Sequence, residues 1–318
     1  MTDTTASDWG NYWKGRAASE AGAALVGAGI ETDSDIAAIW AEEFAGLTPD
    51  TRVLDLACGA GSALKAASAA GLTNLKGVDI AEEALQVMAR EVPGATGVAA
   101  PADRTGLESA SFDRVVSQFG LEYAGLQKAA REAARLLAPG GAFAAIIHLK
   151  DGAIARECSE KLAELNVIRD SEFIVKGQKL FRALFAADAD KSQAAVDRAT
   201  RAVNAFKPAM DAVQRLRDKQ SGQSLASHLY DGTAQLYQRR ATYALADIEG
   251  WLKGMAGEIG AYRGRMESML ASAQSEADIR AALDLFAAAG HKPEPPRKIA
   301  LKDGGAPAAW WVRAGTPR

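Results

Sequence analysis

The sequence has little cysteine and little histidine, and this scarcity narrows the chemistry open to the protein. Among 318 residues there are two cysteines, Cys58 and Cys158, and three histidines. The cysteines lie a hundred residues apart, and no group of cysteine and histidine has the spacing of metal ligands. We therefore expect no metal site and no disulfide framework, and a reducing cytoplasm is the simplest location.

Long apolar runs and an excess of basic residues are also absent. No window approaches the roughly 18 uninterrupted apolar residues of a membrane helix, and the start MTDTTASDWGNYWKGR lacks the apolar core of a signal peptide. The formal net charge is −3, which argues against binding nucleic acid through an overall basic surface. We expect neither a membrane nor a nucleic acid among the partners.

Between residues 52 and 149, short apolar segments alternate with helical ones. RVLDLA, LKGVDI, ATGVAA, FDRVVSQFG and AFAAIIHL predict five strands, and the segments between most of them predict helices. LAPGG predicts the turn before the fifth strand. Near the end of the chain, RKIAL and AAWWVRA predict a β-hairpin. This rhythm is typical of an α/β fold with a parallel sheet and helices on both of its faces.

Residues 150–275 carry no convincing strand and predict an all-helical insertion after strand five. Apolar residues recur there at helical spacing, as in EFIVKGQKLFRALF. Breaks between helices are expected near Ser171, Asp188–Asp190, Ser221–Ser224 and Gly250–Gly260. The block holds 19 Lys and Arg against 16 Asp and Glu, so it is nearly neutral.

The segment VLDLACGAGSAL ends the first strand in two glycines, which suit a backbone that turns sharply against a ligand. A dinucleotide fingerprint requires a third small residue where this sequence has Leu64, so that interpretation fails. A site for a nucleoside without a pyrophosphate remains. Asp79, 20 residues after Gly59 at the end of strand two, suits ribose hydroxyls. Asp103, after strand three, suits an exocyclic adenine amino group.

The segments VLDLACGAG, GVDIA, PADRTGLESASFDRVVSQFGLEY and LLAPGGAF, in this order and spacing, resemble the motifs of class I S-adenosylmethionine-dependent methyltransferases. Within this family, the sequence resembles the small-molecule methyltransferases related to ubiquinone and menaquinone biosynthesis enzymes. The resemblance covers residues 52–149 and 276–318. It implies S-adenosyl-L-methionine as cofactor and a Rossmann-like, seven-stranded, mostly parallel sheet whose last strand is antiparallel.

The resemblance also implies a domain organisation. Residues 51–149 and 276–318 would form the cofactor-binding domain, and residues 1–50 would hold a helix, ended by Pro49, and a lid. The helical insertion, residues 150–275, is far longer than the family's usual segment at this place. It would serve as a substrate cap or as a dimerisation module, with a homodimer as one consequence.

Site residues follow from the same motifs. Asp55 would lie under the methionine end of the cofactor and order the glycine loop, although a buried carboxylate that only caps loop amides is the alternative. Asp79 would hold the ribose, and the residues ending strand four would lie beside the sulfonium. The implied cofactor contacts are Asp55, Ala57, Gly59, Gly61, Asp79, Ile80, Asp103, Arg104, Ser117, Gln118 and Phe119, with Tyr12 and Trp13 in the lid.

Three further residues are candidates for the acceptor side. His148 lies near the end of strand five, at the same sheet edge as the glycine loop, with a core histidine as the alternative. Glu122 and Tyr123 follow strand four and would orient a polar acceptor, or only pack. The methyl group is already activated by the sulfonium, so a base is needed only if the acceptor arrives protonated.

The function expected is methyl transfer from S-adenosylmethionine to a small molecule by in-line displacement. Three alternatives stay open. The helical insertion could dock a protein substrate, the same pocket could transfer another group of the cofactor, or the chain could be a non-catalytic partner. The near-neutral insertion disfavours RNA as a substrate.

Overall fold

The structure is a computed structural model that describes residues 34–219, 224–301 and 305–315. It divides into two compact units. The sheet unit comprises Met1–Cys158 and Glu267–Arg318, and the helical unit comprises Ser159–Met266. The lid residues proposed from the sequence, Tyr12 and Trp13, lie outside the described residues.

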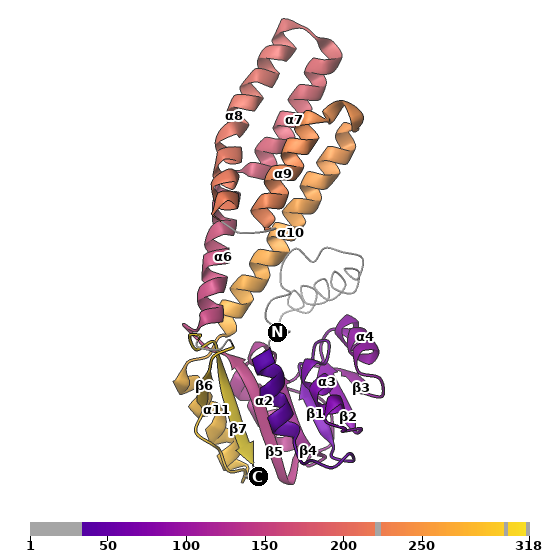
Figure 1. Ribbon diagram of the computed structural model, residues 1–318, viewed down its shortest axis with the longest axis vertical. Helices are drawn as coiled ribbons and strands as arrows, with labels where there is room; N and C mark the ends of the chain where they lie inside the picture. Colours follow the sequence, from indigo (N-terminus) through magenta and orange to yellow (C-terminus); the bar gives the residue numbers. More distant parts are fainter. Residues whose placement is uncertain (1–33, 220–223, 302–304, 316–318) are drawn as a thin grey trace. The chain divides into compact units, whose positions relative to one another are not determined.

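The sheet unit is built on one seven-stranded sheet with the order β3-β2-β1-β4-β5-β7-β6. Strands β1 to β5 run parallel, and β7 runs antiparallel to both of its neighbours (Figure 1). This confirms the fold class, the antiparallel last strand and the terminal hairpin. The strands are β1 Val53–Leu56, β2 Leu75–Asp79, β3 Thr96–Ala99, β4 Phe112–Gln118, β5 Leu137–His148, β6 Arg297–Ile299 and β7 Ala309–Gly315.

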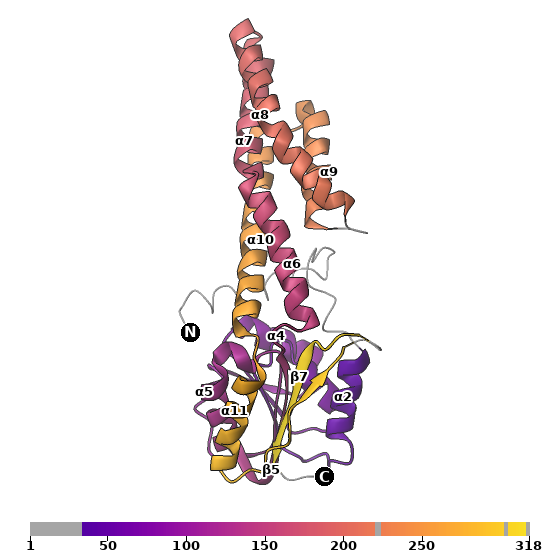
Figure 2. The same cartoon turned by 90° about the vertical axis from the view of Figure 1, so that its left-hand side faces the viewer.

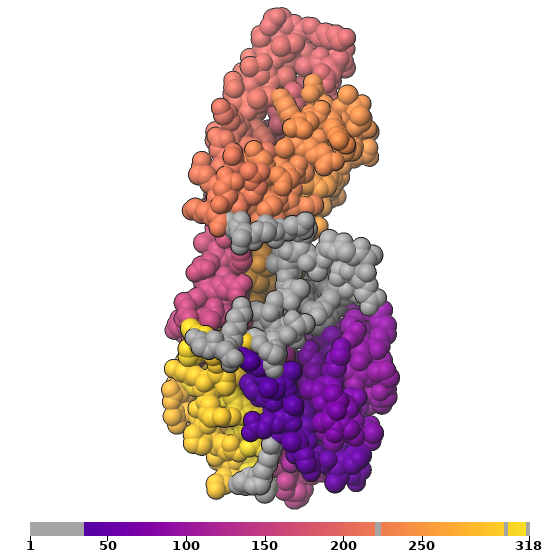
Figure 3. Space-filling view, viewed as in Figure 1, coloured from indigo at the N-terminus to yellow at the C-terminus, as the bar shows by residue number. Residues whose placement is uncertain are grey.

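Helices cover both faces of this sheet. Figure 2 shows α5 (Leu126–Leu136) and α11 (Glu276–Ala288) on one side and α2 (Ser34–Phe44) on the other. Helix α3 (Ser62–Ala69) packs beside α2. In Figure 3, the indigo residues of α2 lie between the yellow C-terminal strands and the purple helices α3 and α4 (Glu82–Glu91).

Two adjacent tryptophans on β7 point to opposite faces of the sheet, as alternation along a strand requires. Trp310 joins the core cluster beneath α5 and α11, and its Nε1 donates to the carbonyl of Gln274 at 2.9 Å. Trp311 meets Trp40 of α2 edge to face, with ring centroids 5.5 Å apart. The two faces of β7 therefore bind the sheet to different helical layers.

The segment LAPGG differs from its prediction. The predicted turn is contained within β5, which begins at Leu137. Gly140 has a φ of +78°, and the pairing with β4 jumps from Phe112↔Leu137 to Arg114↔Ala142. The chain therefore bulges at these residues without ending the strand, because β4 offers pairing partners on both sides of the bulge.

The helical unit has a core of its own. It contains α7 (Phe173–Asp190), α8 (Gln193–Asp218), α9 (Leu225–Gln238) and η3 (Arg240–Thr242). It also contains most of α6 (Ala153–Asp170) and α10 (Leu245–Ser272). Phe181, Leu229 and Leu252 are fully buried in one apolar cluster. In the described ranges, no helix is long and apolar enough to cross a membrane.

One predicted helix break is wrong. Helix α10 runs unbroken through the glycines between residues 250 and 260, and the chain turns earlier, around Arg239–Tyr243. A glycine in a helix costs only about 1 kcal/mol relative to alanine. Burial of Ile248, Leu252 and Met255 along α10 offsets that cost.

Candidate active site

The candidate site lies at the carboxyl ends of the parallel strands, where the strand order reverses between β1 and β4. Open α/β sheets bind ligands at such points. Ala57, just after β1, has a φ of +54°. A Cβ placed on Gly120, just after β4, would lie 2.5 Å from the carbonyl oxygen of Ala57. The two loops therefore touch through their backbones, and residue 120 must be a glycine for this approach.

The glycine loop after β1 is fixed by Asp79. Its carboxylate accepts hydrogen bonds from the backbone N–H groups of Gly59 and Ala81, both at 2.9 Å. Gly59 and Gly61 have positive φ angles of 51° and 80°, and a Cβ on Gly61 would lie 2.7 Å from the side chain of Met88. Each carboxylate oxygen keeps acceptor capacity, so Asp79 can order the loop and still accept from ribose hydroxyls.

Asp55 is a buried carboxylate on strand β1, just before the glycine loop. It is 1% exposed, and in the described part of the chain its Oδ1 has no hydrogen-bond partner. Burial raises the pKa of Asp55 well above its ordinary value, and the neighbouring charge of Asp79 raises it further. An unpaired buried carboxylate is costly. A ligand with a cationic or N–H group fits this position, as the amino group of S-adenosylmethionine does.

The predicted adenine side is formed by Ile80 after β2 and by Asp103 and Arg104 after β3. Ile80 and Asp103 are half-buried, and Arg104 is exposed. The loop that carries the last two residues is anchored by Glu132 of α5, whose Oε1 accepts from the backbone N–H and the hydroxyl of Thr105 at 2.9 and 2.6 Å. The loop position is therefore set from the helix beneath it.

Glu132 also pairs with Arg135, which donates to both carboxylate oxygens at 2.7 and 2.8 Å. Burial alone would raise the pKa of Glu132, but the hydrogen bonds from Arg135 and Thr105 outweigh it and lower the pKa to about 2. Arg135 further donates to the carbonyl of Leu107 at 2.8 Å. This ionised group holds the loop between β3 and β4 in place.

At the end of β4, two of the predicted cofactor contacts have protein partners. The hydroxyl of Ser117, wholly buried, donates to the carbonyl of Leu56 at 2.7 Å and accepts from the N–H of Leu121 at 3.1 Å. The Oε1 of Gln118 accepts from Trp40 Nε1 at 2.7 Å. Their side chains tie β4 to β1 and to α2, so their contact with a cofactor stays a prediction.

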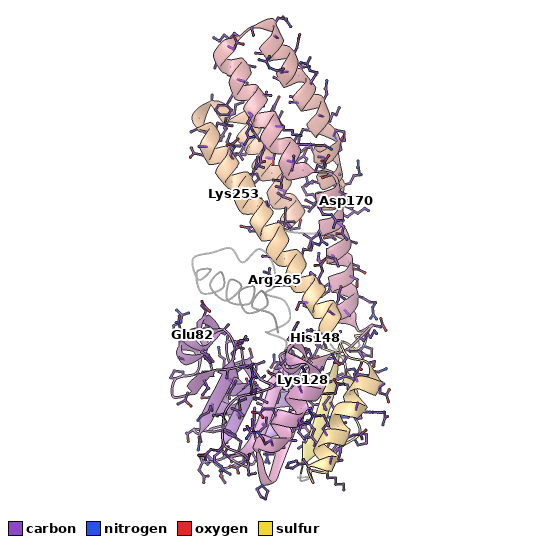
Figure 4. The ribbon with its side chains drawn as sticks, turned by 180° about the vertical axis from the view of Figure 1, so that it is seen from behind. Glu82, Lys128, His148, Asp170, Lys253 and Arg265 are labelled. Atoms are coloured by element: carbon purple, nitrogen blue, oxygen red, sulfur yellow. The ribbon has the colours of Figure 1, made fainter. Side chains whose placement is uncertain are left out.

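The three acceptor-side candidates lie together in space. His148 Nδ1 is 2.7 Å from Glu122 Oε1. The ring of Tyr123 meets the imidazole edge to face, with ring centroids 6.0 Å apart. The ring of Phe119, another predicted site residue, has its centroid 4.4 Å from that of the imidazole. His148 ends β5 at the carboxyl edge of the sheet (Figure 4).

Four residues that shape this site were missed when only the sequence was considered. Gly120 was missed because a single glycine after a strand is a weak signal. Its position just after strand four is the only sequence feature that could have indicated it. Glu132 and Arg135, at i and i+3 on one helix, resemble an ordinary surface pair. Trp40 lies in the helix predicted before Pro49, but its indole N–H bond to Gln118 depends on tertiary packing.

The comparisons with known proteins centre on this part of the chain. The family described as "Methyltransferase domain" matches residues 54–145. No curated protein resembles the chain closely enough to count as a relative.

Several solved structures resemble the chain over part of its length. The YcgJ protein from Bacillus subtilis is 26% identical, covers 41% of this chain and 57% of its own, and has a TM-score of 0.35. A methyltransferase from Mesorhizobium loti that depends on S-adenosylmethionine is also 26% identical, with coverages of 35% and 52% and a TM-score of 0.32. The chain thus spans about half the length of these structures, and at such TM-scores the likenesses do not bear on function.

The family match begins in β1 and ends in β5, and it includes the glycine loop and the acidic residues described above, whereas His148 lies three residues beyond its end. The buried Oδ1 of Asp55, without a hydrogen-bond partner in the part of the chain that the structure describes, and the loop held by Asp79 fit the cofactor of that family. Residues 54–145 are therefore a methyltransferase domain, and its family implies S-adenosyl-L-methionine as the cofactor.

Proposed function

We propose that this protein transfers a methyl group from S-adenosylmethionine to a small-molecule acceptor. The observation that carries the proposal is the buried Oδ1 of Asp55, which has no hydrogen-bond partner among the described residues, next to a glycine loop that is hydrogen-bonded to Asp79. Burying a carboxylate oxygen without a hydrogen-bond donor destabilises the folded protein. A cationic ligand that binds at this oxygen would remove the unfavourable free energy.

Each end of the cofactor has residues suited to it. Asp55 and the backbone of the loop at Gly59 and Gly61 would hold the amino-acid end. Asp79 would accept from the ribose hydroxyls, and Ile80 and Asp103 would flank the adenine, as in the sequence-based prediction.

When bound, the sulfonium supplies an activated methyl group. The contribution of the chain is then to align the acceptor with that group and to exclude water.

The surroundings of His148 support a small acceptor. The imidazole and the Glu122 carboxylate are buried, with the aromatic rings of Phe119 and Tyr123 against the imidazole. Aromatic side chains together with a few polar groups suit contact with a small, partly apolar molecule. We include in this proposal the sequence resemblance to the methyltransferases of quinone biosynthesis, because it is consistent with such an acceptor.

Calorimetric titration with S-adenosylmethionine and S-adenosylhomocysteine tests the proposal. Asp55→Asn should weaken binding of the former by about 1.5–3 kcal/mol, the range for a lost hydrogen bond to a charged group. Asp113→Asn is the matched control, because Asp113 pairs with Arg52 at the opposite end of β4 and its loss should leave affinity unchanged. Absence of binding by the wild-type protein would refute the proposal.

A second arm of the experiment addresses the acceptor. Cell extract is separated into small molecules and protein, and each fraction is incubated with the enzyme and cofactor labelled at the methyl group. Label in the small-molecule fraction is expected. Label confined to protein would instead favour docking of a protein substrate.

A further inference from the structure

Glu122 fixes His148 through two hydrogen bonds to one oxygen. Its Oε1 accepts from the backbone N–H of His148 at 3.0 Å and faces the imidazole Nδ1 at 2.7 Å. Both residues are buried, with exposures of 3% and 5%. A side chain held at its backbone and at its ring has little freedom to turn, so the imidazole is preorganised.

This contact also decides which ring nitrogen carries the proton. Oε1 already accepts from a backbone N–H, and an ionised carboxylate has no hydrogen to donate. Nδ1 must therefore be the donor, and in the neutral ring Nε2 is left with a lone pair. In the described part of the protein Nε2 has no hydrogen-bond partner, so it is available as a proton acceptor.

The second oxygen of the Glu122 carboxylate also favours proton uptake at Nε2 of His148. Glu122 Oε2 is buried and has no hydrogen-bond partner among the described residues. A carboxylate that is only partly satisfied keeps more of its negative charge for its remaining partner. It is therefore suited to stabilise an imidazolium, the species that forms when Nε2 takes up a proton.

A chain of contacts links this pair to the cofactor loop. The ring of Phe119 lies against the imidazole, Phe119 is followed by Gly120, and Gly120 approaches the backbone of Ala57. Ala57 leads directly into the glycine loop. The imidazole thus lies on the side of the site where β4 ends, next to the predicted position of the sulfonium.

We propose that His148 is the general base of this enzyme, that Glu122 is its positioning residue, and that the acceptor is a phenolic or enolic hydroxyl. This inference rests on the proposed methyltransferase function and specifies its acceptor. The hydroxyl proton passes to Nε2 of His148 while an oxygen lone pair forms the new O–CH₃ bond. The S–CH₃ bond breaks with its electron pair going to sulfur, so the sulfonium leaves as a neutral thioether.

The chemistry of the base selects the class of hydroxyl. An imidazole is too weak a base to ionise an aliphatic alcohol appreciably. It can take the proton of a phenol, whose pKa of about 10 matches that of a tyrosine side chain. The aromatic rings of Phe119 and Tyr123 around the imidazole suit a planar acceptor.

The first experiment varies the acidity of the acceptor. Turnover of 4-methoxyphenol, which is protonated near neutral pH, and of 4-nitrophenol, which is largely ionised at pH 8, is followed by release of S-adenosylhomocysteine. His148→Gln should lower kcat about 10²–10⁴-fold on 4-methoxyphenol, the usual contribution of a general base. On 4-nitrophenol it should leave turnover near the wild-type value.

The controls separate folding from chemistry. His291→Gln removes a histidine whose Nε2 lies 3.2 Å from the carbonyl of Ala134, and it should act like wild type on both phenols. The affinity of His148→Gln for S-adenosylhomocysteine should also equal that of wild type. Equal losses on both phenols with normal affinity would overturn the role of base.

The second experiment needs no turnover. Nitrogen-15 NMR of the histidine-labelled full chain should show His148 protonated at Nδ1 and bare at Nε2, with assignments from His148→Gln, His228→Gln and His291→Gln. An Nε2–H tautomer at His148 would overturn the proposal. Glu122→Gln keeps an acceptor oxygen but loses the charge, so it should preserve this tautomer, lower kcat and leave KM unchanged.

The outcomes also distinguish this inference from the function on which it rests. If wild type binds S-adenosylhomocysteine but methylates neither phenol, the acceptor class is wrong while the methyltransferase proposal stands. If wild type binds neither form of the cofactor, the proposed function itself fails.

Discussion

The sheet unit and the helical unit differ most in what they bury. Among the residues that the structure describes, nine polar or charged side chains are buried, and eight of them belong to the sheet unit. The exception is Thr233 on α9. The eight are Glu43, Asp55, Asp79, Thr105, Ser117, Glu122, Glu132 and His148.

The two units therefore differ in the cost of their interiors. Burying a polar group is unfavourable unless hydrogen bonds satisfy it, and the sheet unit buries several polar groups around one edge of its sheet. The helical unit is held together by aliphatic and aromatic side chains. The sheet unit is therefore organised for chemistry, and the helical unit, as described, is organised for packing.

The largest effect is expected from a cavity in the helical unit. Phe181 is fully buried in its apolar cluster, and Phe181→Ala should destabilise this unit by about 3–5 kcal/mol. Urea unfolding followed by circular dichroism measures the loss, and cofactor affinity should be unchanged. Val175→Ala on the same helix, at a position 48% exposed, is the control. A marked drop in cofactor affinity for Phe181→Ala would break the contrast between the units.

The next effect concerns a polar contact in the sheet unit. Glu132→Gln removes the charge that holds the loop through Thr105 and Arg135 and should cost about 1.5–3 kcal/mol at pH 7. Glu276→Gln, which breaks the exposed pair with Arg280 on α11, should cost under about 1 kcal/mol. Equal losses in the two variants would show that burial adds nothing to the Glu132 network.

The same variant has a defined pH dependence. The folded-state pKa of Glu132 is about 2, against an ordinary value of 4.5. A lowered carboxyl pKa stabilises the fold above the unfolded-state value, and this stabilisation is lost as the pH falls from about 5 towards 2. The difference in unfolding free energy between wild type and Glu132→Gln should therefore shrink between pH 6 and pH 3, and a constant difference would contradict the assignment.

Replacing a glycine by alanine should change the free energy of unfolding in opposite directions in the two units. Gly120→Ala brings a Cβ to 2.5 Å from the carbonyl of Ala57, so it should cost about 1–3 kcal/mol by overpacking and weaken cofactor binding. Both values come from thermal unfolding and calorimetric titration. Normal affinity in a folded Gly120→Ala would show that the close approach of the two loops is not required.

The smallest effect is the matching change in the helical unit. Gly254 lies inside α10, and a Cβ there would meet nothing within 4 Å. Gly254→Ala should stabilise the helix by about 0.5–1 kcal/mol, measured as a higher unfolding temperature. Destabilisation at this open position would indicate that the glycine has a role beyond helix packing.

Much of the fold was predictable from local pattern. The period of apolar residues marked the strands of the sheet, and α11 follows an N-cap at Ser275, a residue type that favours the start of a helix and here forms a capping box with Asp278. The order of motifs indicated the family before any contact was known. The boundaries of helices and strands were predicted less well. The glycines of α10 suggested a break, but burial of apolar side chains keeps the helix continuous. LAPGG suggested a turn, but pairing with β4 makes it part of β5.

The strands, the glycine loop and the acidic residues at the strand ends can be predicted from the sequence alone, because each depends on residues that are near neighbours in the chain. The hydrogen-bond partner of each side chain is set by the tertiary fold. The fold brings Asp79 to the N–H of Gly59, 20 residues away, and Glu122 to His148, 26 residues away. The physical reason is that hydrogen bonds between strand ends depend on strand order and on how the helices pack, and neither leaves a local signal in the sequence.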